Sequence, residues 1–172
     1  PFDNPELRKA VAMTIDHKAF VDILGEGNGD VGTAVQPGPE GQWAMPKEMR
    51  EALPGYSPDI GKSREEARKI LQSLGYGPDK HLSFKIAARN LPDYRDAASL
   101  MIDQLKQIWI DGELEVIDTA VYYNRVFKKD YVVALNLSGS AVDDPDVTFF
   151  EGYACGSLRN YNNYCNPEMT KM

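Results

Sequence analysis

The sequence contains no run of eighteen apolar residues, so it predicts no transmembrane helix. It also lacks an excess of basic residues, because 19 lysines and arginines stand against 26 aspartates and glutamates, for a formal net charge of −7. Sequence-independent nucleic-acid binding needs clustered cations, so no nucleic-acid partner is expected. An apolar share of 42% in 172 residues is enough for one folded domain with a core.

Motifs of common enzymes and cofactor proteins are scarce as well. His17 and His81 have no partners at zinc-ligand spacing, and the G-x-G-x-x-G pattern at 27–32 follows a predicted helix instead of a strand. The segment Ser138–Ser140 has no glycine two residues after its second serine, so it does not indicate a nucleophile elbow. Neither a metal nor an organic cofactor is therefore expected.

The apolar positions change between helical and strand periods along the chain. The expected elements are helices over 5–14 and 17–25, an irregular loop over 26–58, a helix from the capping box at 63–66 to Gly75, a strand over 82–88, a helix over 93–109, a strand over 113–118, a helix over 120–130 and a strand over 131–138. The last strand is apolar enough to be buried on both faces. This order predicts an α/β fold with a parallel or mixed sheet flanked by helices.

The stretch SAVDDPDVTFFEGYACG, residues 140–156, leaves the carboxyl end of the last predicted strand. Its carboxylates at Asp143, Asp144 and Asp146 are compatible with a calcium site or a general acid–base pair. They are also compatible with a solvated turn whose bend Pro145 fixes. Ligands of open α/β sheets gather outside the carboxyl ends of the strands, which favours the lip of a binding cleft.

Aromatic residues follow the acidic stretch. Phe149 and Phe150 are expected in a core. Tyr153, Tyr161 and Tyr164 are better suited to contact a ligand, because a tyrosine has an apolar face and a polar tip.

The sequence has two cysteines, Cys155 and Cys165, both near its end. A disulfide between them would close a short loop and stabilise the fold by roughly 2.5–3 kcal/mol in the chain-entropy model. An even number of cysteines at close range is typical of an oxidising compartment. Two unrelated buried thiols remain the alternative.

Two similar helix starts stand at the two ends of the chain. Asn4-Pro5-Glu6 and Asn166-Pro167-Glu168 each place a capping side chain before a proline at the first helical position. The second start begins a helix where the sequence stops. We therefore expect a piece of a longer protein, with a frayed natural terminus as the alternative.

Four segments carry a family resemblance in the same order. PFDNPELRKAVAMTIDHKAF contains Arg8, Ala10, Ile15 and Asp16 at the positions of a family motif, and SREEARKILQSLGY is similar to the helix that follows. The later segments are IWIDGELEVIDTAVYYNRVFKKDYVVAL and the run from DDPD to NYNNYCNPEM. Together they resemble the family 5 solute-binding proteins of ABC importers, the peptide and nickel group.

The resemblance implies one lobe of a bilobal periplasmic-binding-protein fold of type II-like class, in which two lobes close on a ligand. Residues 1–140 would form the α/β lobe. Residues 141–172 would form the cleft lip and the crossover toward the first lobe, which this sequence does not contain.

Ligand-binding residues are expected after the last strand and in the long loop. They are Ser138, Gly139, Ser140, Ala141, Asp143, Asp144 and Trp43. Peptide-binding relatives carry an aspartate four residues before the proline of this turn, which pairs with the amine of the ligand, and a tryptophan seven residues before it. Here these positions are Ala141 and Ser138, which implies that a free peptide amine is not bound in the usual way.

The family further implies a periplasmic, non-enzymatic component of an ABC importer. It would capture an oligopeptide or a related small polar compound by closure of two lobes and deliver it to a membrane permease. We expect it to act as a monomer. The alternative is a carboxylate-type enzyme that acts on a polar substrate through Asp143 and Asp144.

Overall fold

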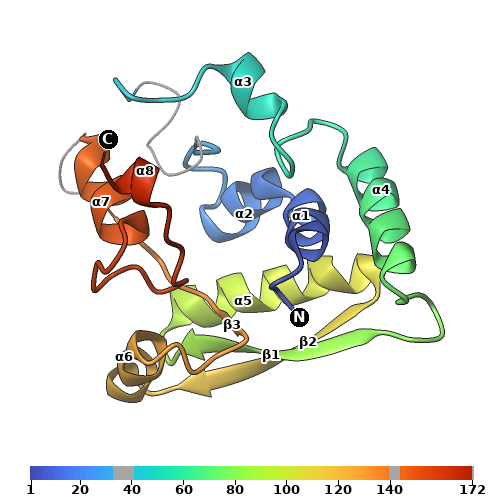
Figure 1. Cartoon of the computed structure of the whole chain (residues 1–172). Coiled ribbons are helices and arrows are strands. Elements are labelled where there is room, and N and C mark those ends of the chain that lie inside the picture. The colour runs from blue at the N-terminus through green and yellow to red at the C-terminus, as the bar shows by residue number, and fades with distance from the viewer. Residues whose placement is uncertain (33–40, 140–143, 172) are drawn as a thin grey trace.

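The computed structural model describes residues 1–32, 41–139 and 144–171 (Figure 1). Its elements in chain order are α1 Pro5–Thr14, α2 His17–Leu24, α3 Lys47–Glu51, α4 Ile60–Ser73, β1 Leu82–Arg89, α5 Pro92–Leu105, the short 3-10 helix η1 Lys106–Ile108, β2 Ile110–Ile117, α6 Thr119–Phe127, β3 Val133–Ala134, α7 Pro145–Tyr153 and α8 Pro167–Thr170. Within these residues, no helix has the length and apolar character needed to cross a membrane.

The three strands are parallel and lie in the order β2-β1-β3. β1 pairs with β2 along its whole length, from Leu82 opposite Ile110 to Arg89 opposite Ile117. β3 pairs with β1 on the other side. The α/β fold with a parallel sheet that the sequence predicts is therefore confirmed.

The third strand is much shorter than the strand predicted over 131–138. It contains only Val133 and Ala134, which are half-buried, while Val132 and Leu137 beside it are exposed. The prediction that this strand is buried on both faces was wrong. β3 stands at an edge of the described sheet, where only its β1 side is paired.

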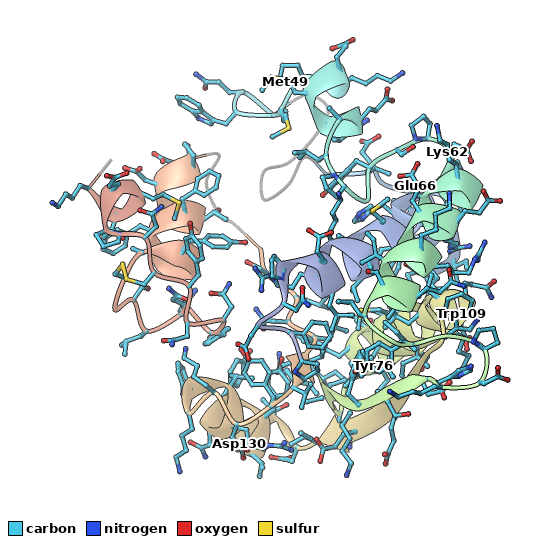
Figure 2. All side chains as sticks on the ribbon, turned by 45° about the vertical axis from the view of Figure 1, so that its right-hand side comes forward. Met49, Lys62, Glu66, Tyr76, Trp109 and Asp130 are labelled. Carbon is cyan, nitrogen blue, oxygen red and sulfur yellow. A yellow bond between two sulfur atoms is a disulfide. The ribbon has the colours of Figure 1, made fainter. Side chains whose placement is uncertain are left out.

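The main core lies between one face of the sheet and helices α1, α4 and α5. Alternate residues of β1 point into it, because successive side chains of a strand face opposite sides. Its largest fully buried side chains are Leu7, Leu71, Ile86, Leu105, Ile108 and Ile110. Side chains fill the space between these elements in Figure 2, and the labelled Tyr76 and Trp109 pack against the edge of this core.

The opposite face of the sheet is covered near its carboxyl end by α6. Ala87, Ile117, Tyr122 and Val126 form a second buried cluster there. The Tyr122 hydroxyl donates a hydrogen bond of 2.6 Å to the Leu135 carbonyl oxygen. This bond fixes α6 to the residue that follows β3.

Several helix boundaries differ from the predictions. Asp59 accepts a hydrogen bond of 2.9 Å from the Lys62 backbone and caps α4 at Ile60, so the helix begins before the capping box and Ser63 is buried inside it. The short helix α3 interrupts the predicted loop over 26–58, because its sequence KEMRE consists of good helix formers.

The chain reverses between α5 and β2 earlier than predicted. α5 ends at Leu105, η1 follows, and Trp109 adopts a left-handed conformation with φ 62°. β2 therefore starts at Ile110 and not at residue 113. The predicted caps Asn4 and Asn166 are confirmed, because each accepts a backbone hydrogen bond of 2.9 Å at its helix start.

Residues 144–171, here called the C-terminal unit, contain α7 and α8. A disulfide joins Cys155 and Cys165, with Cα atoms 4.7 Å apart. Pro145, at which a solvated turn was one of the alternatives, instead begins the first turn of α7. No residue of α7 is buried, and Phe149 and Phe150 are 45% and 65% exposed, so the prediction that they lie in a core was wrong for this chain.

Candidate functional site

The carboxyl ends of the three parallel strands bring distant parts of the chain to one edge of the sheet. β1 ends at Arg89 and β2 at Ile117, which are opposite each other. The Leu135 backbone N–H donates to the Ala87 carbonyl oxygen at 2.9 Å, and the chain then leaves the sheet as the segment 136–139. This is the edge at which ligands of open α/β sheets gather.

Two charged residues stand at this edge: Asp118, whose carboxylate caps α6, and Arg89, which hydroxyl groups surround. The Arg89 Nη1 donates to the Tyr94 hydroxyl at 2.9 Å and to the Tyr123 hydroxyl at 3.3 Å. Its Nε and Nη2 both lie 3.4 Å from the Thr119 hydroxyl. The guanidinium carbon also lies 4.8 Å and 5.1 Å from the ring centres of Tyr94 and Tyr123, within cation–π distance.

No carboxylate of the described residues forms an ion pair with Arg89. The hydrogen bond to the Tyr94 hydroxyl raises the pKa of Arg89 above its already high ordinary value, so the side chain stays cationic. Within residues 1–32, 41–139 and 144–171 the hydrogen-bond partners of this guanidinium are all neutral, and a guanidinium without a paired carboxylate forms strong, charge-assisted bonds with carboxylates. The arrangement is therefore chemically suited to bind an anionic group.

Local sequence places the partners of Arg89. Tyr94 lies in the first turn of α5, directly after β1. Thr119 and Tyr123 stand four residues apart on α6 and so share one face of that helix. Burial raises the pKa of Tyr122 well above its ordinary value of 10.0, so its hydroxyl stays protonated and keeps its bond to Leu135.

The predicted ligand-binding residues are only partly described. Ser138 and Gly139 are exposed on the segment that leaves the sheet, and Trp43 is 52% exposed. Asp144 accepts a hydrogen bond of 2.9 Å from the Asp146 backbone and caps α7. Among the described residues no hydrogen bond, ion pair or ring contact joins the side chains of Ser138, Trp43 and Asp144 to one another.

Ser140, Ala141 and Asp143 lie outside the described residues. The assignment of a ligand to this segment therefore stays a prediction. The described residues contain no group of three or more potential ligands that could hold a metal ion.

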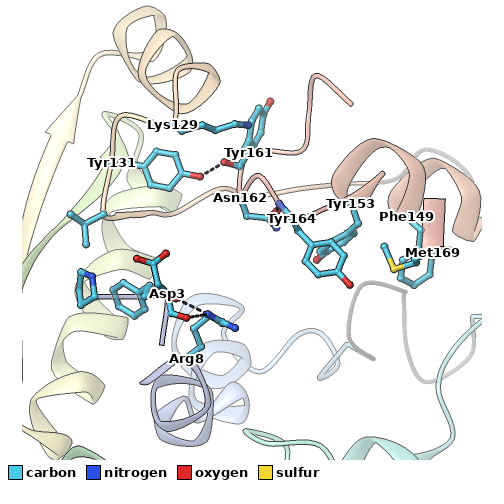
Figure 3. A pocket seen from close by; sticks show the side chains of 13 residues that line it. Asp3, Arg8, Lys129, Tyr131, Phe149, Tyr153, Tyr161, Asn162, Tyr164 and Met169 are labelled. Carbon is cyan, nitrogen blue, oxygen red and sulfur yellow. Dashed lines mark hydrogen bonds between the residues drawn. The ribbon is translucent and has the colours of Figure 1, made fainter. Parts of the chain in front are cut away.

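A second feature is a cavity of about 990 Å³ between the start of the chain and the C-terminal unit, here called the aromatic pocket (Figure 3). It is lined by Pro1, Phe2, Asp3, Arg8, Lys129, Tyr131, Val132, Phe149, Tyr153, Tyr161, Asn162, Tyr164 and Met169. Arg8 donates to the Phe2 and Asp3 carbonyl oxygens at 2.7 and 3.1 Å. The three tyrosines that the sequence marked as suited to a ligand all line this pocket.

Two side chains that follow α6 attach the C-terminal unit to the lobe. The Lys129 ammonium donates to the Asn160 carbonyl oxygen, and the Tyr131 hydroxyl donates to the Tyr161 carbonyl oxygen. The Tyr161 ring packs against Phe127 at 5.5 Å. Burial raises the pKa of both Tyr131 and Tyr161, which keeps the two hydroxyls neutral.

Arg89 is the residue that sequence reasoning missed. Its signal was present, because an arginine ends a strand whose other outward positions are small or polar, at the edge where ligands bind. Its partners Thr119 and Tyr123 come from a helix 30 and 34 residues further along the chain, so the sequence alone did not bring the group together.

Comparison with known sequences gives a family. Residues 1–159 match the family described as "Bacterial extracellular solute-binding proteins, family 5 Middle". Similar curated proteins include "Probable di/tripeptide-binding protein 5" of Pseudomonas aeruginosa, 24% identical over 178 residues, and "Periplasmic oligopeptide-binding protein OppA" of Haemophilus influenzae, 29% identical over 182 residues. These alignments cover 100% and 99% of this chain but 31% of each relative, so the chain spans about a third of their length.

Solved structures share the fold. The Escherichia coli murein tripeptide binding protein MppA superposes with a TM-score of 0.80 at 19% identity, over 98% of this chain and 32% of that one. Haemophilus influenzae OppA in complex with RPPGFSPFR gives a TM-score of 0.73 at 28% identity, over 99% of this chain and 33% of that one. The predicted α/β lobe of the periplasmic-binding-protein fold is confirmed.

Proposed function

Because the chain belongs to the family 5 bacterial extracellular solute-binding proteins, we propose that it is one lobe of an ABC-importer component that captures an oligopeptide or a related small polar solute. The names of its relatives support this proposal, since they describe peptide-binding and periplasmic proteins. The full-length protein would act in the periplasm as a monomer and deliver its solute to a membrane permease.

The proposal rests on Arg89 at the carboxyl edge of the sheet, whose guanidinium has no ion-pair partner in the part of the chain that the structure describes. A peptide ends in a carboxylate, and a guanidinium binds a carboxylate through two parallel hydrogen bonds. Bound to Arg89, the peptide would lie along the segment 136–139 and the predicted residues that follow it. Arg89 would thus bind the C-terminal carboxylate of the peptide, and it is a residue that the structure describes.

Closure of two lobes would supply the remaining affinity. The aromatic pocket and the carboxyl edge are both open to solvent in the lobe described here, with Arg89 half-exposed. A second lobe would remove water from Arg89, which strengthens its interaction with an anion. In this proposal residues 1–140 form the ligand-binding lobe and residues 141–172 the cleft lip and crossover.

The carboxylate-enzyme alternative has no observation in its favour. The Asp144 carboxylate is used as the cap of α7, and the family and its relatives are binding proteins. Substitution of Asp143 and Asp144 by Asn would abolish turnover of a polar substrate if this alternative were true.

Native mass spectrometry of the full-length protein, purified from periplasm without refolding, tests the proposal. A discrete excess over the denatured mass is expected, and its composition identifies the solute class. In parallel, di- to pentapeptides are expected to raise the melting temperature and to produce closure in small-angle scattering. Absence of both an excess mass and any response to a broad panel of peptides, sugars and opines would contradict a solute-binding role.

The role of Arg89 is tested by calorimetry with trialanine and its C-terminal amide. Loss of a hydrogen-bonded charge predicts that Arg89→Gln weakens trialanine binding roughly 10- to 100-fold. The affinity for the C-terminal amide should fall much less, because the amide has no carboxylate for Arg89 to bind. Arg95→Gln is the matched control, since Arg95 is exposed and its guanidinium donates to the Asn90 side chain at 3.4 Å.

A further inference from the structure

The guanidinium of Arg89 is held unevenly on its two sides. Both hydrogen bonds of Nη1 go to tyrosine hydroxyls, at 2.9 and 3.3 Å, and both rings lie against the guanidinium. The opposite edge, formed by Nε and Nη2, has among the described residues one hydrogen-bond partner, the Thr119 hydroxyl, which the two nitrogens share at 3.4 Å. The Nη1 side is therefore held by two hydrogen bonds, whereas the Nε–Nη2 edge shares one acceptor at a distance that is long for a hydrogen bond.

An arginine side chain that is free to rotate loses considerable entropy when it binds a ligand. Tyr94 and Tyr123 remove this freedom beforehand, because each contributes a hydrogen bond and a ring contact. A guanidinium offers a carboxylate two pairs of parallel N–H groups, one on its Nε–Nη2 edge and one on its Nη1–Nη2 edge. Because both hydrogen bonds of Nη1 go to tyrosine hydroxyls, the Nε–Nη2 edge is the one left to match the two oxygens of a carboxylate. A single hydroxyl oxygen now occupies the place of those two oxygens.

We propose that Tyr123 is a positioning residue for Arg89, which it orients so that the Nε–Nη2 edge receives the carboxylate of the ligand side-on, with Thr119 as the group that the carboxylate replaces. The inference rests on the proposed function and deepens it. An Arg89 side chain held in this orientation would select a carboxylate over a neutral amide through the direction of its N–H groups as well as through its charge.

Tyr123 is suited to this role because its ring has an aromatic neighbour on two sides, Tyr122 edge-on at 5.5 Å and Phe127 at 6.4 Å. The Tyr122 hydroxyl is in turn bonded to Leu135, the residue that follows β3. The orientation of Arg89 is therefore connected through α6 to the segment 136–139, which is expected to contact the same ligand. Tyr94, in contrast, is 7% exposed and belongs to the main core, so its substitution would also alter packing.

The test uses the full-length protein, with trialanine and its C-terminal amide as probes in calorimetry. Tyr123→Phe keeps the ring and removes one hydroxyl. We expect it to weaken trialanine binding about 3- to 10-fold and to leave the affinity for the amide within twofold. Tyr76→Phe is the matched control, because Tyr76 lies between α4 and β1, packs against the main core and has the Lys80 ammonium 5.7 Å from its ring centre. Thr119→Val is expected to change trialanine affinity less than twofold.

A second readout does not depend on a ligand. The Nε–Hε signal of Arg89 in nitrogen-15 relaxation should report a rigid side chain in the wild type and a clearly lower order parameter in Tyr123→Phe. In the Arg89→Gln background, Tyr123→Phe should have no further effect on trialanine.

The outcomes separate the two proposals. Unchanged order of Arg89 and unchanged trialanine affinity in Tyr123→Phe overturn the positioning role, as does an equal loss for trialanine and its amide. A loss in Thr119→Val as large as that in Tyr123→Phe overturns the assignment of the receiving edge. Unaltered trialanine binding in Arg89→Gln overturns the role of Arg89, and with it the positioning role of Tyr123, while solute capture stands. No excess mass and no response of the wild type to peptides, sugars or opines overturns the proposed function itself.

Discussion

The α/β lobe and the C-terminal unit are stabilised by different means. The lobe buries large apolar side chains between the sheet and helices α1, α4 and α5. In the C-terminal unit Ala154 is the buried apolar residue among those described, and Asn160 is buried beside it. The disulfide and hydrogen bonds hold this unit instead, such as that from the Cys155 backbone to the Thr170 hydroxyl at 3.0 Å. One chain therefore combines a lobe that is stabilised by apolar burial with a C-terminal unit that is stabilised by a disulfide.

The largest effect is expected from truncating the core of the lobe. Leu71 of α4 is fully buried, so Leu71→Ala should lower the free energy of unfolding by about 2–5 kcal/mol through lost burial and the cavity it leaves. Amide hydrogen exchange of β1 in the full-length protein measures this loss. Leu158→Ala is the control, because Leu158 is 82% exposed. An equal effect of both variants would show that burial does not stabilise the lobe.

Removing the disulfide should lower the stability of the C-terminal unit. The double variant Cys155→Ala, Cys165→Ala is expected to cost roughly 2.5–3 kcal/mol in the chain-entropy model. Exchange should accelerate in the amides of α7 and of the loop 154–166, while β1 keeps its protection. If β1 lost protection to the same extent, the two regions would unfold as one unit and the comparison would fail.

The hydrogen bond from Tyr122 of α6 to Leu135, the residue after β3, is expected to make stability sensitive to alkaline pH. Tyr122 has a pKa raised above its ordinary value of 10.0 by burial, so the unfolded chain loses its proton first as the pH rises. Stability from this group is complete below pH 10.0 and is lost as the pH rises through the higher folded pKa. Urea unfolding at pH 8, 9, 10 and 11 should show a decline above pH 10. Tyr122→Phe should flatten that decline and cost about 1–3 kcal/mol at pH 8, because the Leu135 carbonyl loses its donor.

The smallest effect is expected where the two regions meet. Tyr131→Phe removes the hydroxyl that donates to the Tyr161 carbonyl oxygen and should cost about 0.5–1.5 kcal/mol. Hydrogen exchange around residues 160–164 should rise, with no change in α4. Phe127→Leu, which alters the neighbouring ring contact without touching this bond, is the comparison variant. A larger rise of hydrogen exchange in α4 than at residues 160–164 would contradict this prediction, because Tyr131 would then stabilise the lobe and not its contact with the C-terminal unit.

The sequence predicted the lobe well, because periodic burial determines its elements. Leu7 and Ala10 mark the buried side of α1, and the alternation in LSFKIAAR marks β1. The short β3 was overestimated, since apolar composition does not reveal whether a strand has neighbours on both sides. The helix α7 was not predicted, and a solvated turn was one of the alternatives left open for its start, because an Asp-Pro pair begins both structures.

The candidate site was predicted only in its location. The carboxyl end of the last strand was identified from topology, and the segment there remains the predicted ligand contact. Arg89 was missed because its significance depends on which partners it lacks, and an absent counter-ion is visible only once the fold brings Tyr94, Thr119 and Tyr123 around it.

The order of the strands in the sheet has a consequence for biosynthesis. β1 lies between β2 and β3 but precedes both in the chain. On the ribosome, β1 therefore emerges with two unpaired edges, and these stay open until α5 with β2 and then α6 with β3 have been made. Unpaired strand edges invite association between nascent chains. Lys85, exposed in the middle of β1, is a side chain of the kind that discourages such pairing during this interval.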